Sequence, residues 1–515
     1  MKKLISILIA CMLLMSIGLS AAAEGSTPPS PPEGGMGGTP PDMPEGGMGG
    51  TPPDMPEGGM GGTPPDMPEG GMGGTPPDMP EGGMGGTPPD MPEGGMGGTP
   101  PGMPGGSSSA DLTYTAAVEI TASETQADQT YTSDTVDESA LIINTDGSVT
   151  IENPTVTKTG SSTGGDNCNF YGLNAAVLAM GGTTVTITGG TIESSADGAN
   201  GVFSYGGNGG QNGAEGDGTT VVISDTVITT TGSGSGGIMT TGGGITYASN
   251  LTVTTSGGSS APIRTDRGGG TVVVDGGTYT SNGLGSPAIY STADITVSNA
   301  ELVSNLSEGV CIEGLNSITL NNCSLTANNT KCNGNATFLD SIMIYQSMSG
   351  DADSGTSSFT MTDGTLRSMN GHIFHVTNTH AVIRLSNVTL INEDEDNVLI
   401  SVCDDGWSGA DNTAEFYADA QALSGAVLVG SDSSLTLNLT NGSTLEGYVS
   451  GNITNSKGNV VSTEAGTVSV TLDETSTWTL TADSYITEFN GSAANVISNG
   501  YTLYVNGTAL EGVTE

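Results

Sequence analysis

The stretch IYSTADITVSNAEL, from Ile289 to Leu302, contains one complete unit of the pattern that decides the fold. It begins with a short strand at Ile289, and a second strand follows in which Ile295 and Val297 alternate with polar residues. Another apolar residue, Leu302, comes five positions after Val297, and Asn299 stands between them. A period of two places the apolar side chains on one face of each strand. Asparagine tolerates left-handed backbone angles, so Asn299 predicts a bend between two strands.

The same unit recurs at intervals of 23 to 36 residues through much of the chain. The first strands are expected to begin at Val177, Val202, Ile238, Ile263, Ile289, Ile312, Ile344 and Val376. The bends are expected at Gly189, Asp225, Gly276, Asn299, Asn322, Asp363 and Asn387. The segment from Tyr247 to Val253 fits this register poorly. One unit cannot bury its own apolar strip, whereas units stacked about 4.8 Å apart share a continuous core.

These features predict an all-β fold, a single right-handed parallel β-helix (β-solenoid) over residues 110–515. Helix signals are nearly absent, and the LxxLxLxxN string of leucine-rich repeats is missing. The strings ITGGTI (187–192), VDGGTY (274–279) and SPAIYSTADI (286–295) resemble secreted bacterial β-helix proteins described as carbohydrate-binding or adhesin-like. The body as a whole resembles the pectate-lyase-like superfamily. This resemblance implies the fold more specifically than it implies any activity.

Two segments of different character precede the body. Residues 1–23 combine two lysines, an apolar run and a small-residue site, which is typical of a secretory signal peptide. Cys11 lies in a string that resembles a lipobox, so a lipid anchor is the alternative. Residues 24–109 repeat the unit PEGGMGGTPPDM every 12 residues. Because glycine pairs maximise backbone freedom and proline pairs favour extended chain, this repeat predicts a disordered spacer.

Charge and cysteine content exclude several classes of protein. The chain has 55 acidic and 9 basic residues, a formal charge of −46, which excludes nucleic acid as a partner because phosphates require clustered cations. No later stretch has the roughly 18 apolar residues of a spanning helix, so no integral membrane segment is expected in the mature chain. Five cysteines follow Cys11, an odd number that does not indicate a disulfide framework, although Cys323 and Cys332 could bridge a loop.

A ridge of charged and aromatic residues is expected on the outer face of the first strands. Its candidate carbohydrate-binding residues are Arg264, Asp266, Arg267, Tyr290, Glu313, Tyr345 and Gln346. Tyrosine rings beside charged and hydroxyl groups suit a sugar chain. The alternatives are an ion pair of Arg264 with Asp266 or Glu313 that only joins neighbouring units, or catalysis with Arg264 or Arg267 as the base. The GHG and RIK strings of polygalacturonase-type hydrolases are absent.

Calcium is a further possible ligand, because hard oxygen donors suit this ion. The candidate ligands are Asp351, Asp353, Asp404 and Asp405, although none of them begins a complete EF-hand loop. All three histidines fall in the string GHIFHVTNTH (371–380), where an extended strand separates them too far for one metal site. The sequence therefore predicts a solvated histidine cluster on the surface.

The function expected from these features is non-catalytic. The chain is predicted to be a secreted or cell-surface β-helix protein that binds a polysaccharide or glycan in an adhesin-like manner. One alternative is a calcium-dependent polysaccharide lyase that acts on uronic-acid polymers. The other is a purely structural surface rod.

Overall fold

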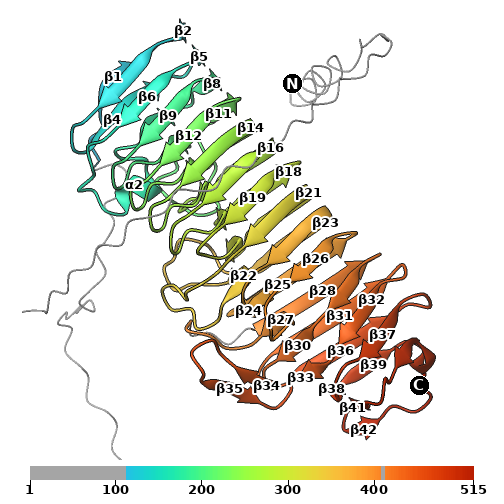
Figure 1. Ribbon diagram of the computed structural model, residues 1–515. Coiled ribbons are helices and arrows are strands. Elements are labelled where there is room, and N and C mark those ends of the chain that lie inside the picture. The colour runs from blue at the N-terminus through green and yellow to red at the C-terminus, as the bar shows by residue number, and fades with distance from the viewer. Residues whose placement is uncertain (1–111, 408–411) are drawn as a thin grey trace, which may run out of the picture. The chain divides into compact units, whose positions relative to one another are not determined.

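The structure is a computed structural model that describes residues 112–407 and 412–515. The predicted signal peptide (1–23), Cys11 and the predicted spacer (24–109) lie outside the described residues. The described residues form strands in nearly every segment and stack them in parallel along the chain (Figure 1). The predicted all-β fold with a single parallel β-helix is confirmed.

One wall of the coil is a 13-stranded sheet in which each strand pairs in parallel with the next. Its strands are β1 (Thr115–Ile120), β4 (Glu138–Asn144), β7 (Val177–Met180), β10 (Val202–Tyr205), β13 (Ile238–Thr241), β15 (Ile263–Thr265), β17 (Ile289–Ser291), β20 (Val310–Glu313), β22 (Asp340–Tyr345), β24 (His372–Thr377), β27 (Val398–Val402), β30 (Ala426–Val429) and β33 (Val449–Ser450).

The rest of the coil is mainly a 20-stranded sheet. Its strands are β2 (Glu124–Ala127), β3 (Thr130–Ser133), β5 (Ser148–Glu152), β6 (Thr155–Lys158), β8 (Thr184–Thr188), β9 (Thr191–Ser194), β11 (Thr220–Ser224), β12 (Val227–Thr230), β14 (Gly244–Thr255), β16 (Gly270–Ser281), β18 (Asp294–Ser298), β19 (Glu301–Ser304), β21 (Ser317–Ala327), β23 (Thr356–Ser368), β25 (Thr379–Ser386), β26 (Thr389–Asn392), β28 (Asn412–Asp419), β31 (Ser434–Thr440), β36 (Thr467–Leu472) and β39 (Glu488–Asn490).

Smaller elements complete the described residues. A four-stranded sheet contains β29 (Ala422–Ser424), β32 (Thr444–Gly447), β37 (Thr477–Leu480) and β40 (Val496–Ile497). An antiparallel pair joins β34 (Asn452–Thr454) to β35 (Val460–Thr463), and β38 (Ser484–Ile486), β41 (Leu503–Val505) and β42 (Thr508–Ala509) form a last sheet. Two short helices, α2 (Asn167–Phe170) and η2 (Ala493–Asn495), also occur.

The bend in the 20-stranded sheet lies where the sequence predicts it. The seven predicted bend residues all have positive φ: Gly189, Asp225, Gly276, Asn299, Asn322, Asp363 and Asn387. Asparagine and aspartate side chains stack along this column, for example from Asn322 to Asn299 at 3.0 Å and from Asn387 to Asp363 at 2.7 Å. These hydrogen bonds join successive turns of the coil, so the bend column also holds the register.

Two details of the predicted register are wrong. Ile289 lies opposite Val310, and Ile312 pairs with Ser291, so this turn is shifted by two residues. Val310 and Ile312 both point into the core, and a period of two cannot distinguish them. The second detail is the segment from Tyr247 to Val253, which belongs to the regular strand β14. Its inward positions include Thr246 and Ala248, which do not resemble a Val or Ile column.

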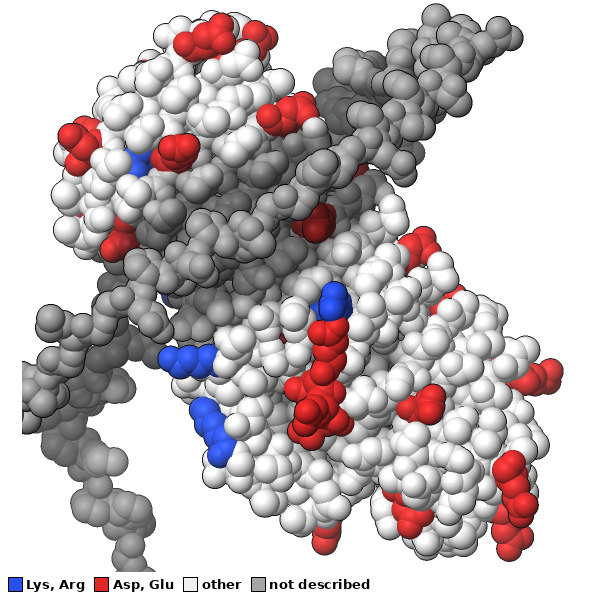
Figure 2. Space-filling view, viewed as in Figure 1, with Lys and Arg blue, Asp and Glu red and all other residues white. Residues whose placement is uncertain are grey.

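The core is a column of inward Val, Ile, Leu and Phe side chains that lies inside the coil. Near its C-terminal half, Phe374 packs edge-on against Phe359 and Phe416, with ring centroids 5.8 and 5.6 Å apart. Cys168, Cys311, Cys323, Cys332 and Cys403 are all free thiols, so the considered bridge between Cys323 and Cys332 is absent from the structure. Acidic side chains are scattered over the face shown in Figure 2, and basic ones are few.

Candidate functional site

The candidate site lies on the outer face of the 13-stranded sheet, which is largely covered rather than open. In the N-terminal half, Phe170 and Tyr171 from the α2 segment pack on the outward side chains of Leu178, Phe203 and Met239. In the C-terminal half, the loop 328–339 between β21 and β22 and the loop 346–355 between β22 and β23 border a pocket of about 450 Å³.

We call this the aromatic pocket because Tyr290, Tyr345 and Trp407 line it. Cys311 and Met343, outward residues of β20 and β22, form part of its wall, and Tyr290 and Trp407 pack against them. The rings of Tyr345 and Trp407 lie 4.9 Å apart between centroids with an interplanar angle of 52°. Three aromatic rings around a concave site provide the apolar surface on which sugar rings stack.

Glu313 holds the two tyrosines in place beneath the pocket. Glu313 lies between the two tyrosines and is only 1% exposed. One carboxylate oxygen accepts hydrogen bonds from the hydroxyls of Tyr290 at 2.6 Å and Tyr345 at 3.1 Å. The other oxygen accepts from Ser347 and Ser349. Four donors satisfy this carboxylate, so Glu313 is a positioning residue whose oxygens are occupied by the protein.

The phenols remain protonated in this arrangement. Burial first, and then the nearby charges including Glu313, raise the pKa of Tyr290 and of Tyr345 well above the usual range. Tyr290 and Glu313 meet although their strands are shifted by two residues from the predicted register, because Tyr345 pairs with Glu313 and Tyr290 reaches it diagonally.

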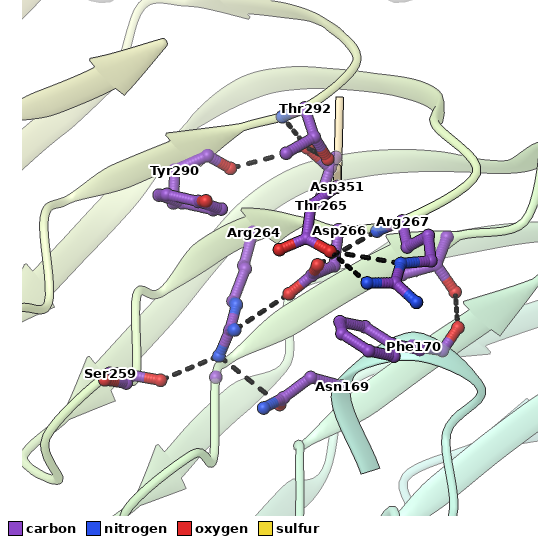
Figure 3. Close-up of polar contacts among 12 residues, drawn as sticks. Asn169, Phe170, Ser259, Arg264, Thr265, Asp266, Arg267, Tyr290, Thr292 and Asp351 are labelled. Carbon is purple, nitrogen blue, oxygen red and sulfur yellow. Dashed lines mark hydrogen bonds and ion pairs between the residues drawn. The ribbon is translucent and has the colours of Figure 1, made fainter. Parts of the chain in front are cut away.

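Arg264 and Asp266 form a separate, internally neutralised pair. The guanidinium of Arg264 lies 2.9 Å from the Asp266 carboxylate and donates to the carbonyl of Ser259 at 2.7 Å, with Asn169 also in reach (Figure 3). It also faces the ring of Tyr290 at 5.8 Å. Burial raises the pKa of Asp266 to about 6, although the charge of Arg264 opposes this shift. Of the two ion pairs considered for Arg264, the structure therefore contains the one with Asp266.

Arg267 fixes the loop that carries Asp351. Its guanidinium donates to one oxygen of Asp351 at 2.6 and 3.0 Å and lies over the ring of Phe170 at 4.1 Å (Figure 3). Burial alone lowers the pKa of Arg267, but the hydrogen bond and charge of Asp351 raise it overall. Gln346 stabilises the same loop, because its side-chain amide donates hydrogen bonds to the backbone carbonyls of Ser347 and Ala352. Gln346 is not among the residues that line the aromatic pocket.

The predicted calcium ligands do not converge. Asp351 is paired with Arg267, and Asp404 accepts a hydrogen bond from Asn412 at 2.6 Å. The carboxylate of Asp405 is buried beside His375, and the backbone carbonyl of Asp353 accepts a hydrogen bond from the N–H of Leu315. Within residues 112–407 and 412–515, no group of three or more His, Cys, Asp or Glu is placed to hold a metal ion. The geometry therefore gives calcium no support, and calcium stays a prediction.

The predicted solvated histidine cluster is wrong. His372 and His375 are buried, and Phe338 from the loop 328–339 covers both rings with centroids 5.3 and 4.6 Å away. Both Nδ1 atoms lie within 2.8 Å of the Ser401 hydroxyl. The covering loop has no strand pattern, so no periodicity in the sequence indicates that these outward positions are covered.

Asp405 connects this buried histidine pair to the edge of the pocket. Its carboxylate lies 3.4 Å from Nε2 of His375, and both side chains are fully buried. One oxygen also accepts from the backbone N–H of Thr337 at 2.8 Å, from the Thr337 hydroxyl at 2.5 Å and from the N–H of Gly406 at 2.7 Å. Asp405 thus holds the loop 328–339 and the turn that leads to Trp407.

The sequence alone did not predict that Trp407, Glu308 and Phe338 lie at this site. Trp407 is one of two tryptophans, which is the only signal that pointed to it.

No family model, curated protein or solved structure matches the chain. Of the described helices, none is long and apolar enough to cross a membrane.

Proposed function

We propose that this chain is a secreted or cell-surface β-helix protein that binds a polysaccharide or glycan without chemical conversion. The observation that carries the proposal is the aromatic pocket, where Tyr290, Tyr345 and Trp407 converge around about 450 Å³. Glu313 fixes both tyrosines through their hydroxyls, so two of the rings are oriented before a ligand arrives. Preorganised rings lower the entropic cost of binding.

The fold and the sequence strings support the same class of ligand. A parallel β-helix with an outward groove, together with the resemblance of ITGGTI, VDGGTY and SPAIYSTADI to carbohydrate-binding β-helix proteins, favours a glycan. Membership of the pectate-lyase-like superfamily is part of this proposal. The expected signal peptide at residues 1–23 supports secretion.

Lyase chemistry is the less favoured alternative because neither candidate base is free. Elimination requires a neutral Arg or Lys to take a proton, whereas Arg264 is paired with Asp266 and Arg267 with Asp351. The pKa of Arg267 is raised by the hydrogen bond and charge of Asp351, which outweigh the lowering by burial, so its guanidinium stays charged. Glycoside hydrolysis requires two carboxyl groups across the substrate, and Glu308 is the only described lining residue with one.

Affinity electrophoresis of the full chain against a glycan panel tests the proposal. We expect at least one polysaccharide to retard the protein, and Trp407→Ala to abolish most of that retardation. Tyr485→Ala is the matched control, because Tyr485 is an aromatic residue on β38 that is 49% exposed and lies outside the pocket. Absence of retardation by every glycan, or equal effects of the two variants, contradicts the proposal.

A parallel assay separates binding from lyase activity. The protein is incubated with polygalacturonate and Ca²⁺ while the absorbance of unsaturated product is followed. The binding proposal expects no product. Steady formation of product that Arg267→Ala abolishes would establish the lyase alternative instead.

A further inference from the structure

We infer that the aromatic pocket selects glycans with a free amino group, and that Glu308 is the residue that recognises the ammonium. This inference rests on the proposed function, since it names the class of sugar that the same pocket takes. Among the described residues, the pocket is lined by a carboxyl group and by no cation, which distinguishes it from a site for uronic acids.

Glu308 is the only charged residue among the described residues that line the pocket. It lies in the turn before β20, is 4% exposed, and accepts a hydrogen bond from the hydroxyl of Ser307. Burial raises the pKa of its carboxyl, although hydrogen bonds that include those from Ser307 and Asn329 partly oppose the shift. In the part of the chain that the structure describes, no Lys, Arg or His forms an ion pair with Glu308.

A second carboxyl group, that of Asp340, interacts electrostatically with Glu308. Asp340, the first residue of β22, is 1% exposed, and neither of its carboxyl oxygens has a hydrogen-bond partner among the described residues. Burial first, and then the charges of Glu308 and Asp405, raise its pKa well above the usual range. A buried carboxylate without a cation is unfavourable, so a positive ligand group beside Glu308 stabilises both residues.

None of the described cations around the pocket lines it, and Lys331, on the loop 328–339, is exposed and is not a lining residue. Arg264 and Arg267 are held by Asp266 and Asp351, and neither lines the pocket. Lys457 donates to the backbone carbonyl of Ala336 at 2.9 Å, on the loop that borders the pocket, and is not itself a lining residue. A uronic acid would bring a carboxylate to a wall whose described residues include Glu308 and no cation. The charge pattern thus favours an amino sugar over a neutral one, and a neutral one over a uronate.

Calorimetric titration of the full chain with three oligosaccharides of equal length tests this order. The probes are a β-1,4-linked glucosamine oligomer, its fully N-acetylated counterpart and an oligogalacturonate. We expect the amine form to bind about tenfold or more tightly than the acetylated form, because a charge-assisted hydrogen bond replaces a neutral contact. We expect the oligogalacturonate to bind weakest.

Variants locate the preference. Glu308→Gln is expected to bring the amine and acetylated forms to equal affinity while the affinity for the acetylated form stays within about twofold. Glu301→Gln removes an exposed carboxylate on β19 and controls for attraction of a cationic probe to an acidic protein, so it should keep the preference. Asp340→Asn, which removes the second buried carboxyl group, should weaken the preference without abolishing it.

The outcomes distinguish this inference from the proposed function. If the three probes bind and Trp407→Ala abolishes binding, but the amine form has no advantage or Glu308→Gln keeps it, only the inference is overturned. If Glu301→Gln reduces the preference as much as Glu308→Gln, the inference is also overturned. If no probe binds although a glycan of the panel retards the protein, only the inference is overturned. If no glycan of the panel binds, or Trp407→Ala has no effect, both proposals fail. The wild-type comparison decides the selectivity even where a variant does not fold.

Discussion

Replacing Asp405 by alanine should release the loop that borders the aromatic pocket. Its buried carboxylate accepts three hydrogen bonds from Thr337 and Gly406 and lies 3.4 Å from His375. A hydrogen bond to a charged group contributes about 1.5–3 kcal/mol. Water can reach the freed Thr337 groups after the loop opens, so we expect a loss of about 3 kcal/mol.

That loss is large enough to measure locally. About 3 kcal/mol corresponds to roughly a hundredfold shift in the opening equilibrium of the loop. Native-state hydrogen exchange should therefore show amides of residues 329–339 exchanging about a hundredfold faster, while amides of β14 and β16 keep wild-type rates. Trp407 should also become more accessible to a fluorescence quencher, whereas Trp478, which is buried in the core, should not.

Asp404→Ala is the matched control for this experiment. It removes the same charge from the adjacent residue, which is exposed and bonded to Asn412 rather than to the loop. Asp404→Ala should leave exchange of residues 329–339 within about twofold of wild type. If Asp405→Ala does the same, or if both variants accelerate exchange equally, the assigned role of Asp405 is refuted.

Three further predictions concern stability. Burial, and to a lesser extent His375, lowers the pKa of His372 from 6.5 to about 3. Between these pH values the unfolded chain binds more protons than the folded one, so acid lowers the free energy of unfolding by up to about 1.4 kcal/mol per pH unit. His372→Gln should reduce this pH dependence in urea titrations at several pH values. Asn322 has a φ of 51°, so Asn322→Ala should lower the free energy of unfolding by about 1–2 kcal/mol, and Asn322→Gly should lower it clearly less. Equal chemical-denaturation midpoints for the two variants would contradict this. Phe374→Ala should cost about 3–5 kcal/mol, and a thermal midpoint unchanged from wild type would show that the aromatic core is not needed.

The fold was predictable because its bend column uses residues with a narrow chemical role. A left-handed backbone favours Gly, Asn and Asp, so residues such as Asn299 and Asn322 mark most bends whatever the neighbouring side chains are, although Ala420 also has a positive φ of 49°. The register was less secure where two apolar residues on the same face were available, as at Val310 and Ile312. The register of β14 was also difficult to predict, because Thr246 occupies an inward position there and its hydroxyl is hydrogen-bonded to that of Thr240 at 2.6 Å.

The candidate site was predictable only where strands carry it. The meeting of Tyr290, Tyr345 and Glu313 follows from outward positions on neighbouring strands. Trp407 and Phe338 lie on loops, whose path depends on contacts such as Thr337 with Asp405 rather than on periodicity. For the same reason the sequence predicted an open ridge and a solvated histidine cluster, whereas loop side chains cover both.

The loops around the aromatic pocket all leave the coil beside the 13-stranded sheet, between strands whose register is held by the bend column on the other walls. Residues 282–288, 328–339 and 346–355 each connect two strands without contributing a residue to the bend column. Evolution can lengthen, shorten or exchange such segments while the coil keeps its winding. Ligand recognition draws on these loops and on outward strand positions, whereas folding draws on inward positions and the bend column, so a new ligand preference can arise without a new scaffold.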